Sequence, residues 1–237
     1  MRPASAQAGL GLVELMVALA LGLFIVSVAT GLLLSQLKEQ HRRLLETRLQ
    51  QELRAGLVLI EADLRRAGRW GTAEQGLWPV TSTAALPANP YAAAVPDSAS
   101  SPTLGYTYSR DATENQAVDA NERFGFRLHP TTRALELRTV GAALAPSAAD
   151  TWQAVSDPQA VVFTELTVTP SISSLSLSER CSLPCPTGAT DCPPQLSVRL
   201  FDVALTAQAT VAPSVQARMS RRIHLPTDVL QGRCPVS

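Results

Sequence analysis

The sequence predicts an α+β protein in which one long N-terminal helix, membrane-spanning in its first half, packs on a mainly antiparallel β-sheet. An apolar run without a charged side chain extends over 23 residues, from Leu15 to Leu37. An amphipathic helical pattern follows it directly. Beyond residue 122 come alternating strand patterns with no helical pattern between them. Strands that follow one another without intervening helices usually form antiparallel sheets.

The apolar run is long enough to cross a membrane, because 23 residues of helix span about 35 Å. We expect the transmembrane part at about residues 12–37. An ordinary secretory signal peptide is the alternative, but the run is long for one, lacks a small-x-small cleavage site and has Glu14 at its edge. A count of flanking basic residues would place the bulk of the chain in the cytoplasm. The cysteines described below favour the opposite orientation, and we give them more weight.

The helix is expected to continue after the run, because apolar residues recur there at steps of three and four. Gly68 is a typical residue for ending it. The sequence thus predicts a helix over residues 10–68, about 87 Å long up to Ala67, whose second half carries the sheet. The apolar stripe comprises Leu37, His41, Leu44, Leu45, Leu49, Leu53, Leu57, Ile60 and Leu64.

The remaining residues, 69–237, predict a β-rich globular domain. Residues 71–122 are rich in Ala, Pro, Ser, Thr and Asn and predict a long irregular connection. Alternating patterns predict a hairpin from Phe124–Leu128 and Leu135–Thr139, and a further strand through Val162, Thr164, Leu166 and Val168. A closing hairpin is predicted from residues 196–207 and 215–225, with its turn around residues 212–214.

Four cysteines, all in the last quarter of the chain, allow two interpretations: Cys181, Cys185, Cys192 and Cys234. They could hold zinc. An even number behind a membrane segment, in a proline-rich stretch, favours two disulfides in an oxidising compartment, with three pairings open. An oxygen-rich loop over residues 111–122 lacks the EF-hand spacing, so we expect a solvated loop, with calcium as the alternative.

Composition and motifs exclude several classes of function. Twenty basic and twenty acidic residues cancel, so no nucleic-acid partner is evident. Lys38 is the only lysine and is not followed by Ser or Thr, which excludes a Walker-type phosphate loop. Neither an HExxH nor a GxSxG pattern occurs. We therefore expect no enzymatic activity, no cofactor, no bound metal and no small-molecule substrate.

The N-terminal segment Gly9–Leu19, with the sequence Gly-Leu-Gly-Leu-Val-Glu-Leu-Met-Val-Ala-Leu, resembles the class III signal of type IV pilins and pseudopilins. The resemblance implies a leader over residues 1–9, cleavage by prepilin peptidase between Gly9 and Leu10, and N-methylation of Leu10. Glu14 then occupies the fifth mature position, as in that family. Leu10 and Gly11 stand where the family usually has Phe and then Thr or Ser.

Later segments resemble the PilW-type minor pilins of type IV pili, with the J-type pseudopilin of type II secretion as the alternative. The resemblance implies a bacterial inner-membrane protein with one transmembrane helix and a periplasmic C-terminal domain. It further implies a role in pilus assembly or priming at the filament tip, with other minor pilins, the major pilin and prepilin peptidase as partners. It is carried by residues 63–71, 135–138, 152–158, 161–166 and 196–225.

Glu14 is the predicted assembly residue. A carboxylate in the membrane core costs about 2.5–3.5 kcal/mol. The free amine of a neighbouring chain's Leu10 can offset that cost, because two unit charges 4 Å apart attract by about 4 kcal/mol at an effective dielectric constant of 20. The alternative is that Glu14 lies at the membrane surface and reaches water.

Overall fold

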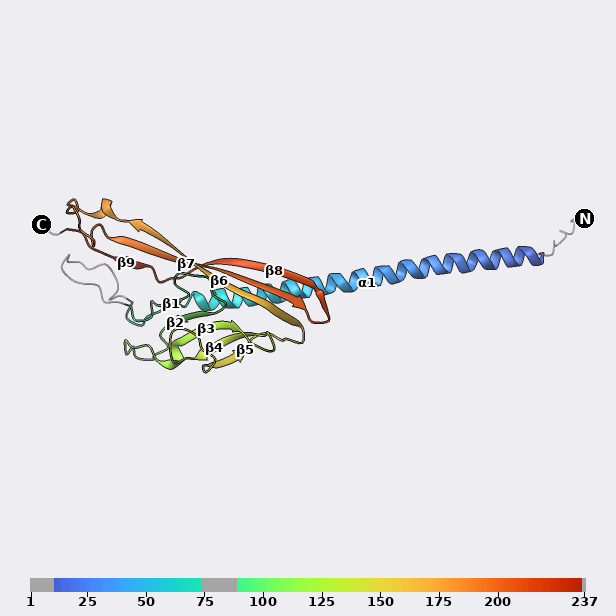
Figure 1. Ribbon diagram of the computed structural model, residues 1–237, viewed down its shortest axis with the longest axis horizontal. Helices are drawn as coiled ribbons and strands as arrows, with labels where there is room; N and C mark the ends of the chain where they lie inside the picture. The colour runs from blue at the N-terminus through green and yellow to red at the C-terminus, as the bar shows by residue number, and fades with distance from the viewer. Residues whose placement is uncertain (1–10, 74–88, 236–237) are drawn as a thin grey trace, which may run out of the picture. The chain divides into compact units, whose positions relative to one another are not determined.

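The computed structural model describes residues 11–73 and 89–235. It contains one long helix, α1 (Leu12–Leu64), and two antiparallel sheets, which confirms the predicted α+β class (Figure 1). The chain divides into two compact units, residues 1–45 and 46–237, which are described separately. The first unit is the first part of α1. The second unit holds the end of α1 and both sheets.

In the first unit, every residue from Gly11 to Leu44 is exposed. This part of α1 is long and apolar enough to cross a membrane. Two of its hydroxyl groups donate to the helix's own carbonyls, Thr30 Oγ1 to Val26 O at 2.8 Å and Ser35 Oγ to Leu32 O at 2.7 Å. These bonds remove the cost of placing hydroxyl groups in an apolar surrounding.

In the second unit, α1 buries one stripe of large apolar side chains against both sheets. Gly56 lies at the closest approach, because a Cβ there would stand 3.2 Å from Leu205 Cδ1 and 3.3 Å from Leu135 Cδ2. The predicted stripe is thus buried only in its second half, whereas its first members are exposed. The buried members are Leu49, Leu53, Leu57, Ile60 and Leu64.

Gly68 ends the turn that follows α1. Its φ of 73° is in the left-handed region, and a Cβ would lie 1.6 Å from Thr227 Cγ2. Its amide donates to the carbonyl of Thr107 at 2.8 Å. Glycine is required here both by conformation and by space, so the chain turns off the helix directly onto the sheet.

The five-stranded sheet runs in sequence order, with all neighbours antiparallel. The predicted hairpin is confirmed, with Phe126 opposite Leu137 and Leu128 opposite Leu135. The first two strands fall within the segment expected to be irregular; the short apolar run around Tyr106 pairs there with the hairpin. The strands are β1 (Ala94–Val95), β2 (Leu104–Thr107), β3 (Arg123–Leu128), β4 (Leu135–Val140) and β5 (Thr151–Ala154), with the 3₁₀ turn η2 (Ala120–Glu122) before β3.

The second sheet has four strands in the order β6-β7-β8, with β9 also paired to β7. They are β6 (Val161–Ser176), β7 (Gln195–Ala209), β8 (Ala212–His224) and β9 (Val229–Gln231); η3 (Ser178–Arg180) is a 3₁₀ turn after β6.

Two predictions about this sheet were wrong in detail. An irregularity between Phe163 and Glu165 shifts the alternation, so Val161 and Phe163 are buried in place of Val162 and Thr164. The hairpin turn lies at residues 210–211, because Ala209 already pairs with Ala212. Pro213 is tolerated within β8 because it lies near the start of an edge strand.

Candidate functional site

The predicted assembly residue Glu14 lies in the first turn of α1. Gly9 and Leu10, the predicted processing site, lie outside the described residues. A carboxylate in the first turn is favoured by the partial positive charge of a helix N-terminus. The neighbouring side chains are apolar and exposed on every side, among them Leu12, Val13, Leu15 and Met16.

This apolar surface extends around the full circumference of the first part of α1, from Leu15 to Leu37. A helix that is apolar all round is normally buried in lipid or among other helices. The first part of α1 therefore needs a partner outside its own chain, and Glu14 is the carboxylate at its edge.

The four cysteines form two disulfides, Cys181–Cys234 and Cys185–Cys192. The first ties the residue after η3 to the segment that follows β9. The second closes a short loop within the connection from β6 to β7. Paired sulfurs do not fit the zinc interpretation, and they agree with an oxidising compartment.

The acidic loop 111–122 is largely exposed, as expected for a solvated loop, and its carboxylates accept hydrogen bonds that fix its backbone. Carboxylate oxygens of Asp111, Asp119 and Glu122 lie within 4.8 Å of one another. Glu122 is fully buried and accepts bonds from the amides of Arg110 at 2.7 Å and Asp119 at 2.9 Å. Asp111 accepts from the amide of Asn115 at 3.2 Å. Asp119 accepts from the side-chain amide of Asn115 at 3.1 Å, so each of the three carboxylates has a hydrogen-bond donor within the loop or beside it.

Glu114 fastens the same loop to the end of α1. It accepts bonds from the amide of Gly71 at 2.9 Å and from the Tyr91 hydroxyl at 3.0 Å. Burial acts to raise the pKa of Glu114, but these hydrogen bonds and that of the Gln116 amide outweigh it, and the pKa is lowered.

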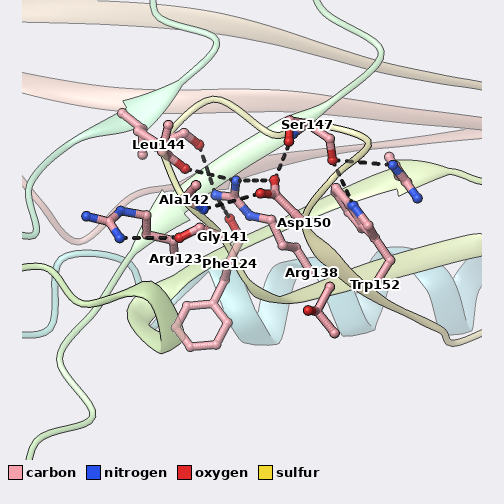
Figure 2. Close-up of polar contacts among 12 residues, drawn as sticks. Arg123, Phe124, Arg138, Gly141, Ala142, Leu144, Ser147, Asp150 and Trp152 are labelled. Carbon is pink, nitrogen blue, oxygen red and sulfur yellow. Dashed lines mark hydrogen bonds and ion pairs between the residues drawn. The ribbon is translucent and has the colours of Figure 1, made fainter.

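A buried ion pair that the sequence did not indicate holds the connection between β4 and β5 (Figure 2). Arg138 on β4 has no exposed surface, and its Nη1 lies 3.1 Å from Asp150 Oδ2. The guanidinium also donates to the carbonyls of Phe124, Ala143 and Leu144 at 2.8–3.0 Å. It thereby ties residues 141–150 to the face of the sheet opposite Leu135 and Leu137.

Asp150 completes this arrangement by accepting bonds from the amides of Ser147 at 2.7 Å and Ala142 at 3.2 Å. Burial acts to raise the pKa of Asp150, but these bonds and Arg138 outweigh it, so the pKa is lowered. Beside it, Arg127 bonds Glu136 at 2.8 Å and lies over the Trp152 ring at 4.0 Å. Arg138 Nε is buried without a hydrogen-bond partner, but the charged groups of the cluster pair with one another, so the cluster holds the connection between β4 and β5 in place.

Residues 42–225 match a family model described as PpdB, prepilin peptidase-dependent protein B. The chain belongs to this family. The matched residues begin after the apolar run, so the match and the resemblance of residues 9–19 to a prepilin signal rest on different parts of the chain. No curated protein and no solved structure matches the chain.

Membership of the PpdB family identifies a pilin-like protein that depends on prepilin peptidase. Such proteins are structural, and the apolar N-terminal helix is consistent with a single-pass membrane protein. From the spacing between Gly9 and Glu14 the sequence predicts the processing and assembly segment of this PpdB-family chain, and that stays a prediction. It missed Arg138 and Asp150, whose only signal was a charged residue inside a predicted strand.

Proposed function

We propose that this PpdB-family protein is a minor pilin that takes part in assembly or priming of a type IV pilus at the inner membrane and filament tip. The observation that carries the proposal is the first part of α1, an exposed apolar helix with Glu14 in its first turn. The second part of the same helix is covered by the chain's own sheets. The first part is therefore the surface that other helices or lipid must cover.

Processing supplies the partner for Glu14. Cleavage after Gly9 would free the amine of Leu10, which is then methylated. A neighbouring subunit's amine next to Glu14 offsets the burial of the carboxylate and sets the axial register between the two helices. Mass spectrometry of the membrane-extracted protein should find an N-terminus at residue 10, whereas a start beyond residue 25 would indicate an ordinary signal peptide.

The J-type pseudopilin of a type II secretion system is the alternative, because its helix start has the same pattern. The residues at the helix exit favour the pilus class by resemblance, with Ala67 and Trp70 buried around the Gly68 turn. The two disulfides support a periplasmic location for the second unit. Recovery of the protein in sheared pili, rather than with a secretion apparatus, distinguishes the two.

The decisive experiment is Glu14→Ala in the full chain. We expect the variant to insert in the membrane as well as wild type, since a costly carboxylate is removed. Its amount in sheared filaments, normalised to its amount in the inner membrane, should fall severely because a neighbour's amine is left unpaired. Glu14→Asp should be intermediate, because the charge remains but its reach is shorter.

Glu39→Ala is the matched control on the same helix. Glu39 is exposed and pairs with Arg43 at 3.1 Å, an i,i+4 contact worth little on a surface. It should enter filaments at the wild-type level. Normal incorporation of Glu14→Ala would show that Glu14 does not set the register of this subunit.

A further inference from the structure

A cleft of about 630 Å³ lies in the second unit, at the end of α1, where Asp63 contributes to its lining. Its walls are the turn after α1, the segment after β2, and strands β3 and β4. Three arginines from two of these elements line it, Arg66, Arg69 and Arg110, and all three side chains are exposed. The fold thus places three guanidinium groups at one hollow although the chain as a whole has no net charge.

The carboxylates in this cleft are already engaged. Asp63 is buried, accepts a hydrogen bond from the Tyr106 hydroxyl, and its Oδ1 lies 3.6 Å from Arg66 Nη1. Asp111 accepts from a backbone amide. In the described part of the chain, neither Arg69 nor Arg110 has a carboxylate within 4.0 Å. Among the described residues, these two cations therefore have no carboxylate partner at the cleft.

The floor of the cleft is aromatic and apolar. The rings of Tyr108 and Phe124 stack with centroids 4.0 Å apart, and the Arg110 guanidinium lies 5.9 Å from the Phe124 centroid. Leu137 of β4 is half-buried beside them. The Tyr108 hydroxyl, a donor at neutral pH like any tyrosine of ordinary pKa, lies among them. Cationic, donor and apolar groups therefore meet in one site.

The backbones that present the two free arginines are held in place. The amide of Ser109 donates to the Arg69 carbonyl at 2.9 Å, and the amide of Arg110 donates to the buried Glu122 at 2.7 Å. Binding therefore needs to order only the side chains, which lowers its entropic cost.

We propose that this cleft binds an acidic segment of a partner protein, with a carboxylate between Arg69 and Arg110 and an aromatic or aliphatic side chain on the Tyr108–Phe124 floor. Guanidinium groups match carboxylates through paired, charge-assisted hydrogen bonds. A protein partner is favoured over nucleic acid, because the chain has no basic excess to neutralise a run of phosphates. The inference does not depend on Glu14.

The test uses the full chain in detergent micelles and a fluorescein-labelled peptide, Asp-Glu-Phe-Asp-Leu, followed by fluorescence polarisation. Its amide analogue, Asn-Gln-Phe-Asn-Leu, should bind at least about tenfold more weakly. Arg69→Gln and Arg110→Gln should each weaken binding of the acidic peptide by about tenfold. Arg218→Gln is the matched control, since Arg218 is an exposed arginine of β8, 3.7 Å from Glu165 and outside the cleft; it should leave the affinity unchanged.

Equal binding of the two peptides would overturn the proposal, as would unchanged affinity in both cleft variants. A five-nucleotide oligothymidylate that bound more tightly than the acidic peptide, and lost affinity in the same two variants, would assign the cleft to nucleic acid instead. Arg69→Lys keeps the charge but not the paired geometry, so partial recovery relative to Arg69→Gln is expected.

Discussion

The two parts of α1 have the same backbone structure and opposite surroundings. Residues 12–44 are exposed throughout, whereas Leu53, Ile60 and Leu64 in the second part have no exposed surface. Residues 15–37 of the first part carry no charge and are apolar on all sides, whereas the second part is apolar along one stripe. Both parts are helical because of the same local backbone hydrogen bonds. What differs is the pattern of apolar residues, and this pattern decides whether the apolar side chains are buried by the chain's own sheets or by lipid and other chains.

Polar groups show the same contrast. Thr30 and Ser35 in the first part bond back to their own helix. In the second part, Asp63 accepts from Tyr106 of β2, and Glu61 pairs with Arg221 of β8. The second part is thus locked to its unit by specific bonds, while the first leaves its outer surface for partners. Four experiments test this contrast.

The largest effect should come from truncating a leucine. Leu53→Ala should destabilise the second unit by about 2–5 kcal/mol, because the lost side chain is fully buried. Leu23→Ala, in the exposed first part, should leave that stability unchanged. Urea unfolding of the full chain in micelles, followed by tryptophan fluorescence, measures both. Similar losses in the two variants would contradict the contrast.

The second largest difference in the free energy of unfolding should come from removing a carboxylate in each part of α1. Asp63→Ala leaves the buried Tyr106 hydroxyl without its acceptor, at a cost of about 1–3 kcal/mol. Asp63→Asn keeps an acceptor and should lose less. Glu14→Ala should leave the free energy of unfolding unchanged, since its expected role is assembly. The same urea titration applies, and a loss for Glu14→Ala would place Glu14 in the fold.

Acid should weaken the second unit and spare the helix. The native pKa of Asp150 is lowered, so below its unfolded pKa of about 3.9 the unfolded chain binds more protons. The stability that Asp150 provides is present above that pH and is lost as pH falls through the native pKa. The urea midpoint should therefore drop more between pH 5 and pH 3 in wild type than in Asp150→Asn, while far-UV circular dichroism retains a helical signal.

The smallest effect should come from the glycines. Alanine is about 1 kcal/mol better than glycine in a helix. Gly56→Ala should nevertheless lose a little stability, by less than about 1 kcal/mol, because its Cβ would crowd the fully packed Leu205 and Leu135. Gly22→Ala has no atom within 4 Å of the added Cβ and should lose none. A gain at Gly56 would mean that these leucines give way.

The sequence by itself determined the features that depend on local periodicity. The apolar run, the stripe that follows it, the glycine at residue 68 and the β3–β4 hairpin are readable because helices repeat every 3.6 residues and strands every two. The spacing from Gly9 to Glu14 likewise predicts the assembly segment from the sequence alone, and the experiments on Glu14 test that prediction.

Only the tertiary structure decided which polar groups are buried and which distant residues meet. Arg138 could be buried because the connection to β5 folds back over it and supplies Asp150 and two carbonyls. The irregularity after Phe163, the cysteine pairing and the arginine cleft likewise depend on contacts between segments far apart in the chain. Local propensity carries no information about such contacts, because their free energy comes from desolvation and bonding across the assembled fold.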